Sequence, residues 1–234
     1  MSTAVIIPTF GRAGKMAAVT RNILEASHAP LNVFFVVERD DAESVAEAGR
    51  LFDENIVSVV NTRKQSYAGA VNTAVSALLD LEWEYFFLGA DDLDFKPGWD
   101  TEALRAAQDG ALVIGTNDLH NPYVLAGTHA THVLVHRDYV TDPRYAYDPD
   151  MAGQVMFEGY DHNFVDTEFV DAAKAAGVFT PCMTSVVEHL HPDWGLSPWD
   201  ATYAKTRARI HDDHGLFRSR EHLWTAHPDG RQLL

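Results

Sequence analysis

Three carboxylates stand close together near the middle of the chain, directly after a run of apolar residues. The segment Phe86–Trp99 reads FFLGADDLDFKPGW, with acidic residues at Asp91, Asp92 and Asp94. Carboxylates at the end of a buried strand need a compensating cation, and Mg²⁺ or Mn²⁺ takes oxygen ligands that it shares with substrate phosphates. A solvated acidic turn is the other interpretation of a DDxD sequence. Its position at a strand end favours the metal site.

A second candidate metal-binding segment is Glu188-His189-Leu190-His191. Alternate side chains of a strand share one face, so both imidazoles would lie on the same side. Neutral imidazole is a common metal ligand, and this spacing would allow His189 and His191 to bind one ion. A pair of surface histidines would have the same pattern, so the sequence leaves both possibilities open.

The elements that must position these residues alternate between strand and helix in the first half of the chain. Short apolar runs predict strands, and apolar residues at helical spacing predict helices. The predicted strands are Ala4–Pro8, Asn32–Glu38, Ile56–Asn61 and Tyr85–Ala90, and the predicted helices are Arg12–Ser27, Asp41–Phe52 and Ala68–Leu81. This alternation indicates an α/β fold with a mostly parallel sheet, in which ligands bind at the carboxyl ends of the strands. The polar residues at those ends are Thr9, Glu38, Asn61 and Asp91-Asp92.

The second half of the chain is less regular. Strands are predicted at Ala111–Gly115, His132–His136 and Val178–Val187. A helix is predicted at Asp166–Ala176, with Asp166 or Thr167 as its N-cap and Gly177 just beyond its end. No internal repeat or low-complexity linker separates the halves, so a single domain over residues 1–234 is expected. Its parts would be residues 1–110, 111–191 and a C-terminal extension over 192–234.

Several conspicuous residues have a structural interpretation that we prefer. Cys182 is expected to be a small residue of the core. The sequence His211-Asp212-Asp213-His214 resembles a metal cluster, but on a polar helix a solvated face is expected. The tryptophans of the C-terminal extension are expected to pack rather than to form platforms for sugars; they are Trp194, Trp199 and Trp224.

Composition limits the classes of partner and compartment. The 234 residues include 18 Lys and Arg against 34 Asp and Glu, a formal net charge of −16 that disfavours a broad nucleic-acid footprint or an anionic membrane surface. A single cysteine excludes an intrachain disulfide and cysteine-rich metal sites. The start MSTAVIIPTFGR lacks the charged segment and long apolar run of a signal peptide, and no stretch reaches about 18 apolar residues. A cytoplasmic protein is expected.

These segments together resemble the inverting glycosyltransferases of family 2, which have the GT-A fold. The features that carry the resemblance are VIIPTF in the first strand, the strand that ends in Glu38, the helix that contains Gly69 and Asn72, and LGADD followed by PGW. The resemblance covers the first half of the chain well and the second half loosely. The combination of Gly-Ala-Asp-Asp with Pro-Gly-Trp is similar to glycosyltransferases encoded by bacteriophages, which would act in the host cytoplasm.

The resemblance implies a Rossmann-like sheet and a site for a nucleotide-sugar donor. It assigns the donor site to Pro8, Thr9, Phe10, Arg12, Glu38, Lys64, Gly69, Asn72, Ala90, Asp91 and Asp92. Glu38 would stand where the family usually has an Asp that contacts uracil and ribose, so UDP is the favoured nucleotide. Asp91 would correspond to the last Asp of the DxD motif and bind Mn²⁺ or Mg²⁺. Gly89 replaces the first Asp of that motif, and Asp94 offers a second register, Asp92-Leu93-Asp94.

The resemblance also implies residues for the chemical step. Asp166 lies where the family has its general base, with Glu168 as the second choice, although an Asp at this position could simply be an N-cap. A late histidine would be an additional metal ligand, His191 in preference to His189, because His191 borders the turn at Pro192. Residues Asp200, Tyr203 and Lys205 could help to close the site. On the acceptor side the candidates are Asn117, Asp118, His129 and His132.

The predicted function is therefore metal-dependent transfer of a sugar, with inversion, from a nucleotide-diphosphate donor to an acceptor hydroxyl. The acceptor could be a protein, a glycan, a lipid or a modified base in DNA. A sugar nucleotidyltransferase is one alternative, although its Gly-rich turn would directly follow the first strand, where Pro8 and Thr9 stand here. A non-catalytic scaffold that binds a nucleotide sugar is the other, and Gly89 is the feature that favours it.

Overall fold

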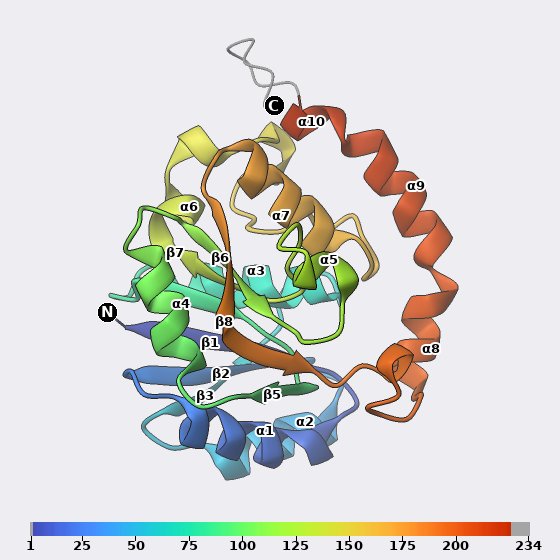
Figure 1. Ribbon diagram of the computed structural model, residues 1–234. Helices are drawn as coiled ribbons and strands as arrows, with labels where there is room; N and C mark the ends of the chain where they lie inside the picture. Colours follow the sequence, from blue (N-terminus) through green and yellow to red (C-terminus); the bar gives the residue numbers. More distant parts are fainter. Residues whose placement is uncertain (1, 226–234) are drawn as a thin grey trace.

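Within residues 2–225, which this computed structural model describes, eight strands form one mixed sheet in the order β3-β2-β1-β4-β7-β6-β8-β5 (Figure 1). The strands are β1 (Thr3–Thr9), β2 (Leu31–Val37), β3 (Ile56–Val60), β4 (Tyr85–Leu88), β5 (Leu93–Phe95), β6 (Val113–Asn117), β7 (Val133–His136) and β8 (Phe179–His189). The helices are α1 (Ala13–Ala26), α2 (Ala42–Leu51), α3 (Tyr67–Leu78), α4 (Trp99–Ala107), α5 (Pro122–Leu125), α6 (Arg137–Thr141), α7 (Val165–Ala175), α8 (Ala201–Ala208), α9 (Ile210–Arg220) and α10 (His222–Thr225). Three short 3-10 helices are η1 (Pro143–Tyr145), η2 (Pro149–Met151) and η3 (Pro192–Trp194). All the predicted strands and helices are confirmed, with their ends shifted by a few residues.

The parallel part of the sheet brings the predicted strand ends to one edge. Strands β3, β2, β1 and β4 all pair in parallel, and the register sets Thr9 opposite Val37. Antiparallel pairing begins where β7 joins β4. The chain reverses its winding between β1 and β4, the kind of position at which doubly wound sheets bind ligands. The polar segments after β1, β2 and β4 therefore meet at this edge.

Two apolar cores lie on the two faces of the sheet. Alternate residues of the strands point to opposite faces, so Ile6 packs with α3 and α7, whereas Ile7 packs with α1 and α4. The second core contains an aromatic cluster in which the ring centroids of Phe87 and Trp99 are 4.6 Å apart. The indole of Trp99 also donates to Ser27 Oγ at 3.0 Å. This packing fixes the turn between β4 and β5, which carries the acidic residues.

Helices α8, α9 and α10 form the C-terminal part of the described chain and run along the outside of the molecule (Figure 1). Asp213 of α9 accepts hydrogen bonds from the backbone N–H groups of Asp161, His162 and Asn163 at 2.8–3.1 Å. The expectation of a solvated face is therefore wrong for Asp213, which is buried, because these three N–H groups would otherwise lack partners. The C-terminal helices thus hold the loop that precedes α7.

Other structural predictions have mixed outcomes. Cys182 is buried in the core, as expected. Trp224 is buried, but Trp194 and Trp199 are 40% and 51% exposed, so packing accounts for only part of their surface. Residues 226–234 of the predicted C-terminal extension lie outside the described residues. None of the helices in residues 2–225 combines the length and the apolar composition that a bilayer crossing requires.

Candidate active site

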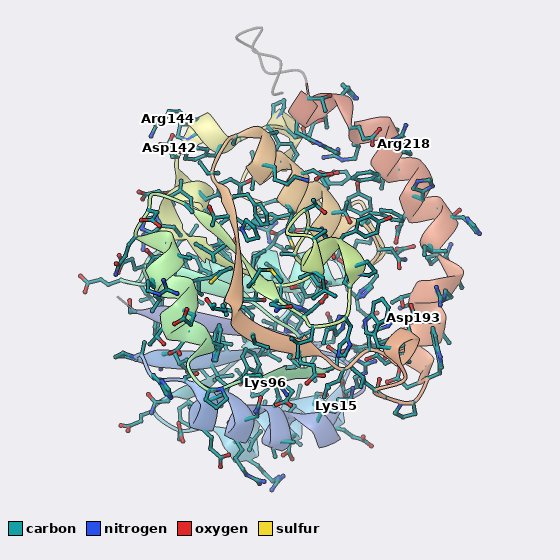
Figure 2. The ribbon with its side chains drawn as sticks, in the orientation of Figure 1. Lys15, Lys96, Asp142, Arg144, Asp193 and Arg218 are labelled. Atoms are coloured by element: carbon teal, nitrogen blue, oxygen red, sulfur yellow. The ribbon has the colours of Figure 1, made fainter. Side chains whose placement is uncertain are left out.

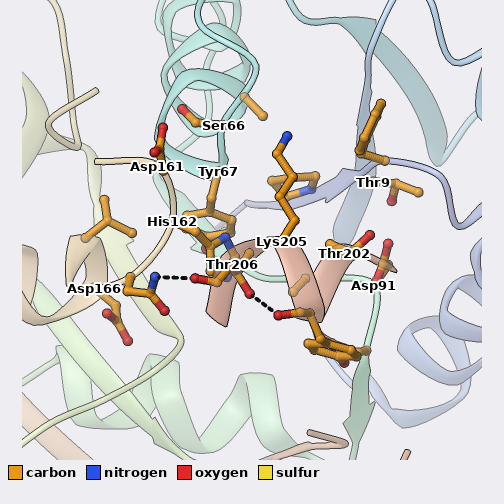
Figure 3. Close-up of a pocket in the computed structure, with 18 of the residues that line it drawn as sticks. Thr9, Ser66, Tyr67, Asp91, Asp161, His162, Asp166, Thr202, Lys205 and Thr206 are labelled. Atoms are coloured by element: carbon orange, nitrogen blue, oxygen red, sulfur yellow. Dashed lines mark hydrogen bonds between the residues drawn. The ribbon is translucent and has the colours of Figure 1, made fainter. Parts of the chain in front are cut away.

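A cavity of about 610 Å³ opens at the carboxyl ends of β1, β2 and β4. One side is formed by the strand ends, the other by the loop before α7 and by α8, and Figure 3 shows Asp91 and Asp166 on opposite sides of it. The predicted donor residues that line it are Pro8, Thr9, Phe10, Arg12, Glu38, Ala90, Asp91 and Asp92. Asp166, His132, His189, His191, Tyr203 and Lys205 line it as well. The fold thus joins acidic and imidazole groups that are far apart in the sequence.

The acidic pair Asp91 and Asp92 lies at the end of β4 and is only 6% exposed at each residue. Arg12 Nη1 lies 3.0 Å from Asp91 Oδ1 and 3.5 Å from Asp92 Oδ2. Burial and the neighbouring Asp92 carboxylate raise the pKa of Asp91 to about 6, although Arg12 opposes this shift. A single guanidinium therefore only partly compensates two buried carboxylates.

Asp92 is the more acidic member of the pair. Burial would raise its pKa, but hydrogen bonds and charge from His189 and the hydroxyl of Tyr203 hold that pKa well below its usual range. Nε2 of His189 lies 3.6 Å from Asp92 Oδ2, and the hydroxyl of Tyr203 donates to the same oxygen. The other oxygen, Oδ1, is buried and has no hydrogen-bond partner among the described residues. A buried carboxylate oxygen of this kind is suited to a cation.

Three histidines, His132, His189 and His191, complete this part of the cavity. His132 is buried, and burial together with the neighbouring His189 lowers its pKa to about 3, so it is neutral at neutral pH. The rings of His189 and His191 have centroids 5.1 Å apart. Burial and His189 also lower the pKa of His191. His132 and His191 thus tend toward the neutral form that metal ions bind.

Asp166 stands in the first turn of α7, across the cavity from the acidic pair. The helix begins at Val165, so neither Asp166 nor Thr167 is its N-cap, which is instead Phe164 with φ of 65°. His129 Nε2 lies 3.3 Å from Asp166 Oδ2. Burial opposes the shift, but the hydrogen bond and charge of His129 lower the pKa of Asp166, while Asp166 in turn raises the pKa of His129. An ionised carboxylate oriented by an imidazole can accept a proton.

Glu168 lies elsewhere, although it is only two residues farther along α7. It is 1% exposed, and both Nε and Nη2 of Arg220 lie 2.9 Å from its carboxylate. The hydroxyls of Tyr147 and Tyr160 donate to it at 2.8 and 2.6 Å. The structure does not bring this candidate base to the cavity, because the helix turns its side chain into a buried ionic cluster.

Three predicted donor residues do not line the cavity. The side chain of Asn72 is buried and bonds to the backbone of Val155 and Met156, which shapes the loop before α7. A Cβ atom at Gly69 would lie 2.0 Å from the carbonyl oxygen of Lys64, so close backbone packing requires this glycine. Lys64 itself donates to backbone carbonyls, with Nζ 2.9 Å from Tyr160 O. These three residues therefore stabilise the backbone around the cavity and do not line it.

The acceptor-side candidates divide in the same way. His132 lines the cavity, whereas His129 does not line it but contacts Asp166. Asp118 instead accepts from the backbone N–H groups of His120 and Asn121 at 3.0 and 2.9 Å. Asn117 donates to Met183 O at 3.1 Å. The structure does not bring Asn117 and Asp118 to the cavity, because both side chains are occupied in bonding neighbouring backbone.

The donor side carries further polar groups. Glu38 lies at the end of β2 and accepts from Asn61 Nδ2 at 2.7 Å. The hydroxyl of Thr9 is buried and has no hydrogen-bond partner among residues 2–225. Sequence reasoning missed Tyr67, His162 and Thr206, which also line the cavity. The only signal for Tyr67 was its place beside Ser66 at the start of α3, and α9 determines the conformation of the His162 loop.

Asp94, the residue that would complete the second DxD motif, is held by contacts outside the cavity. Asp94 accepts from Asn22 Nδ2 at 2.9 Å and pairs with Lys96 at 2.6 Å, and it is not among the cavity residues. The second register is thus not available to a ligand in the cavity. A Cβ at Gly89 would lie 2.9 Å from Cδ1 of Ile7, so an Asp there would require that core side chain to move.

A divalent cation fits this set of residues in one particular way. Within residues 2–225, no three metal-type side chains are grouped closely enough to form a complete site. Mg²⁺ and its relatives, however, are commonly held by one or two carboxylates together with substrate phosphates and water. Asp91 and the unpartnered Oδ1 of Asp92 provide such oxygens, and the imidazoles of His189 and His191 line the same cavity.

Comparison with known proteins identifies similar chains. The family model described as Glycosyl transferase family 2 matches residues 4–166. No curated protein matches the sequence. A mannosyltransferase from Pyrobaculum calidifontis, solved with GDP-Man and Mn²⁺, has a TM-score of 0.67 at 16% identity over 94% of this chain, which spans 64% of the length of that chain. Glucosyl-3-phosphoglycerate synthase from Mycobacterium tuberculosis, solved with Mn²⁺, UDP-Glc and phosphoglyceric acid, has a TM-score of 0.60 at 9% identity over 92% of this chain and 80% of its own. These similarities confirm the predicted GT-A fold.

Proposed function

We propose that this chain, which belongs to the glycosyl transferase family 2, transfers a sugar from a nucleotide-diphosphate donor to an acceptor hydroxyl. The observation that carries the proposal is one cavity with a buried acidic pair on one side and an ionised Asp166, held by His129, on the other. Donor phosphates need a cationic environment, whereas the acceptor needs a base, and the two sides supply these separately.

The nucleoside would bind between the ends of β1 and β2. Pro8, Thr9 and Glu38 line that end of the cavity, and both the Thr9 hydroxyl and the Glu38 carboxylate can bond to a base or ribose. Glu38 is an acceptor and suits an N–H donor such as that of uracil, which is the basis for proposing UDP. The structural neighbours were solved with GDP-Man and with UDP-Glc, so guanine is the competing base.

The acidic pair would hold a divalent cation, Mn²⁺ or Mg²⁺, together with the donor diphosphate. Asp91 would be the principal ligand, with His191 or His189 as an additional one. Such a cation neutralises the charge that develops on the departing diphosphate. Arg12 and Lys205, which both line the cavity, would contribute further positive charge toward the phosphates.

Asp166 would act as the general base. In this step the acceptor hydroxyl gives its proton to the Asp166 carboxylate while its oxygen bonds to the anomeric carbon. The bond from that carbon to the phosphate oxygen breaks on the opposite side, and the diphosphate leaves with the electron pair, so the configuration inverts. The lowered pKa of Asp166 keeps the carboxylate ionised at neutral pH, and His129 fixes its orientation.

The parts of the chain would divide this work. Residues 1–110 would bind the donor, residues 111–191 would supply Asp166 and the acceptor side, and the extension from 192 would cover the cavity through α8. Tyr203, Lys205 and Thr206 of α8 line the cavity, which supports this role for the extension.

Calorimetric titration with UDP, UDP-sugars and GDP, with and without Mn²⁺, tests the proposal. We expect micromolar binding that needs Mn²⁺ and weakens by at least about tenfold in Asp91→Ala. The matched control is Asp94→Ala, which removes a carboxylate that does not line the cavity and should leave binding unchanged. The absence of nucleotide binding would refute the assignment. Metal-independent binding without turnover would favour a scaffold, and release of pyrophosphate would indicate a nucleotidyltransferase.

A further inference from the structure

Arg12 is held on both sides, by the acidic pair and by α8. On one side its Nη1 contacts Asp91 and Asp92 at 3.0 and 3.5 Å. On the other side its Nε donates to Asp200 Oδ2 at 2.9 Å, and its guanidinium carbon lies 4.3 Å from the centre of the Tyr203 ring. Its side chain is only 10% exposed. A guanidinium with so many fixed partners is part of a built site rather than a surface group.

The two α8 residues are themselves well anchored. Asp200 is the N-cap of α8 and accepts from Tyr203 N at 3.0 Å. Tyr203 places its ring against Arg12 while its hydroxyl donates to Asp92. Tyr203 therefore contacts both the Arg12 guanidinium and the Asp92 carboxylate. The position of α8 over the cavity and the position of Arg12 are determined by one set of contacts.

The charges at this site make Arg12 a competitor of any cation that binds the same carboxylate. Asp91 Oδ1 is the oxygen that Arg12 Nη1 contacts, and Asp91 is also the residue that we propose as the principal metal ligand. An arginine cannot lose its proton near neutral pH, so it leaves this oxygen only by moving. Moving it away breaks its contacts with Asp200 and Tyr203 or changes their geometry.

We propose that Arg12 is a resident counter-cation of the Asp91–Asp92 pair that competes with a divalent metal ion for Asp91, and that Asp200 and Tyr203 position it for this competition. The inference rests on the proposed metal-assisted donor site. A metal ion alone has to compete with a well-held guanidinium, so it binds weakly. When the donor diphosphate enters as well, Arg12 gains a bidentate anionic partner. Metal and nucleotide binding are therefore coupled through Arg12.

The direct test measures Mn²⁺ binding to the nucleotide-free protein by electron paramagnetic resonance. In Arg12→Gln the competitor is absent, and we expect Mn²⁺ to bind about tenfold or more tightly than in the wild type. In Asp200→Asn the acidic pair is untouched and Arg12 only loses an anchor, so a smaller gain of about threefold is expected, with an unchanged melting temperature. A role of Asp200 in stability alone would shift the melting temperature and leave the Mn²⁺ affinity as it is.

The matched control is Arg144→Gln, which removes the same charge from an exposed ion pair with Asp142. Figure 2 shows Arg144 at the opposite end of the molecule from Lys15, which lies 5.9 Å from the Tyr203 ring. This variant should bind Mn²⁺ as the wild type does. A gain equal to that of Arg12→Gln would mean that overall charge, not Arg12, controls affinity, and would overturn the proposal.

Coupling supplies a second readout. Addition of UDP should tighten Mn²⁺ binding in the wild type by a clearly larger factor than in Arg12→Gln. Mn²⁺ affinities that are unchanged or weaker in both Arg12→Gln and Asp200→Asn overturn the inference. If the wild type nevertheless binds UDP only with Mn²⁺, the proposed function survives that failure. If no nucleotide binds to the wild type under any condition, it is the proposed function that fails.

Discussion

Asp166 and Glu168 of α7 are only two residues apart, but loss of their charge should affect different properties of the protein. Glu168 is buried against Arg220, Tyr147 and Tyr160, whereas Asp166 lines the cavity. We therefore predict that Glu168→Gln lowers the stability of the protein but leaves its catalytic step intact. The substitution preserves the shape of the side chain, removes its charge and replaces one carboxylate oxygen by an NH2 group, which cannot accept from these donors.

The magnitude follows from the partners that remain. Arg220 also pairs with Asp148 at 2.7 Å, so one of its two carboxylates survives the substitution. Removing one partner of a buried ion pair costs about 3–5 kcal/mol, and because Asp148 is retained we expect a loss of about 3 kcal/mol. For a chain of this length each kcal/mol lowers the melting temperature by about 2–4 °C, which gives a decrease of roughly 6–12 °C.

Thermal unfolding followed by circular dichroism, with urea titration for the free energy of unfolding, measures this loss. Turnover is then compared at a temperature where both proteins are folded, and kcat should stay within about threefold of the wild type. Glu221→Gln is the matched control, because Glu221 forms an exposed ion pair with Arg218. Its effect should be less than about 1 kcal/mol.

The opposite result would refute the reasoning. If Glu168→Gln melts like the wild type and its kcat falls by about a hundredfold or more, Glu168 acts on substrate and not on the fold. A large loss of stability in Glu221→Gln would likewise show that burial does not separate the two ion pairs.

Three further predictions concern the base, a helix clamp and a glycine. Asp166→Asn should lower kcat by about 10²–10⁴-fold while donor binding stays unchanged in calorimetry, and a loss below tenfold would exclude it as the base. Burial opposes the shift, but hydrogen bonds hold the folded-state pKa of Asp213 below its usual value, so its stabilisation is present above the unfolded pKa of about 4 and is lost as pH falls. Asp213→Asn should therefore lower the melting temperature at pH 7 and much less at pH 3, and an equal deficit at both would contradict this origin. Gly69→Ala should destabilise the protein by about 1–3 kcal/mol, because the new Cβ meets the Lys64 carbonyl. Gly49→Ala, whose Cβ has nothing within 4 Å, should stabilise the protein slightly. Urea titrations measure both changes, and equal effects would refute the close packing at Gly69.

The first half of the fold was predictable because its signals are local. Apolar runs such as Asn32–Glu38 indicate strands, and helical spacing in Arg12–Ser27 indicates a helix, without any knowledge of distant residues. Parallel pairing then follows from the alternation of these elements, and it brings the ends of β1, β2 and β4 together. Most of the donor-side residues predicted from these ends, Thr9 and Asp91 among them, accordingly line one cavity.

Some of the predicted site residues do not line the cavity, because their side chains bond to other parts of the protein. The side chain of Asn72 bonds to the backbone of Val155, 83 residues away, whereas Asp118 bonds to the backbone of Asn121 in its own loop. A buried N–H or C=O needs a partner, and the sequence pattern does not show which side chain will provide it. The same uncertainty made Glu168 a reasonable candidate base until Arg220, 52 residues later, was placed beside it.

The sequence by itself determined the class of the fold, the location of the acidic pair at a strand end and the family to which the chain belongs, because these depend on periodicity and on short motifs. Only the tertiary structure decided which carboxylates face the cavity and that Arg12 lies beside Asp91 and Asp92. Tyr203 meets Asp92 across 111 residues, and Asp200 meets Arg12 across 188. Such contacts arise when α8 packs over the strand ends, since buried charges must find partners wherever the fold brings them.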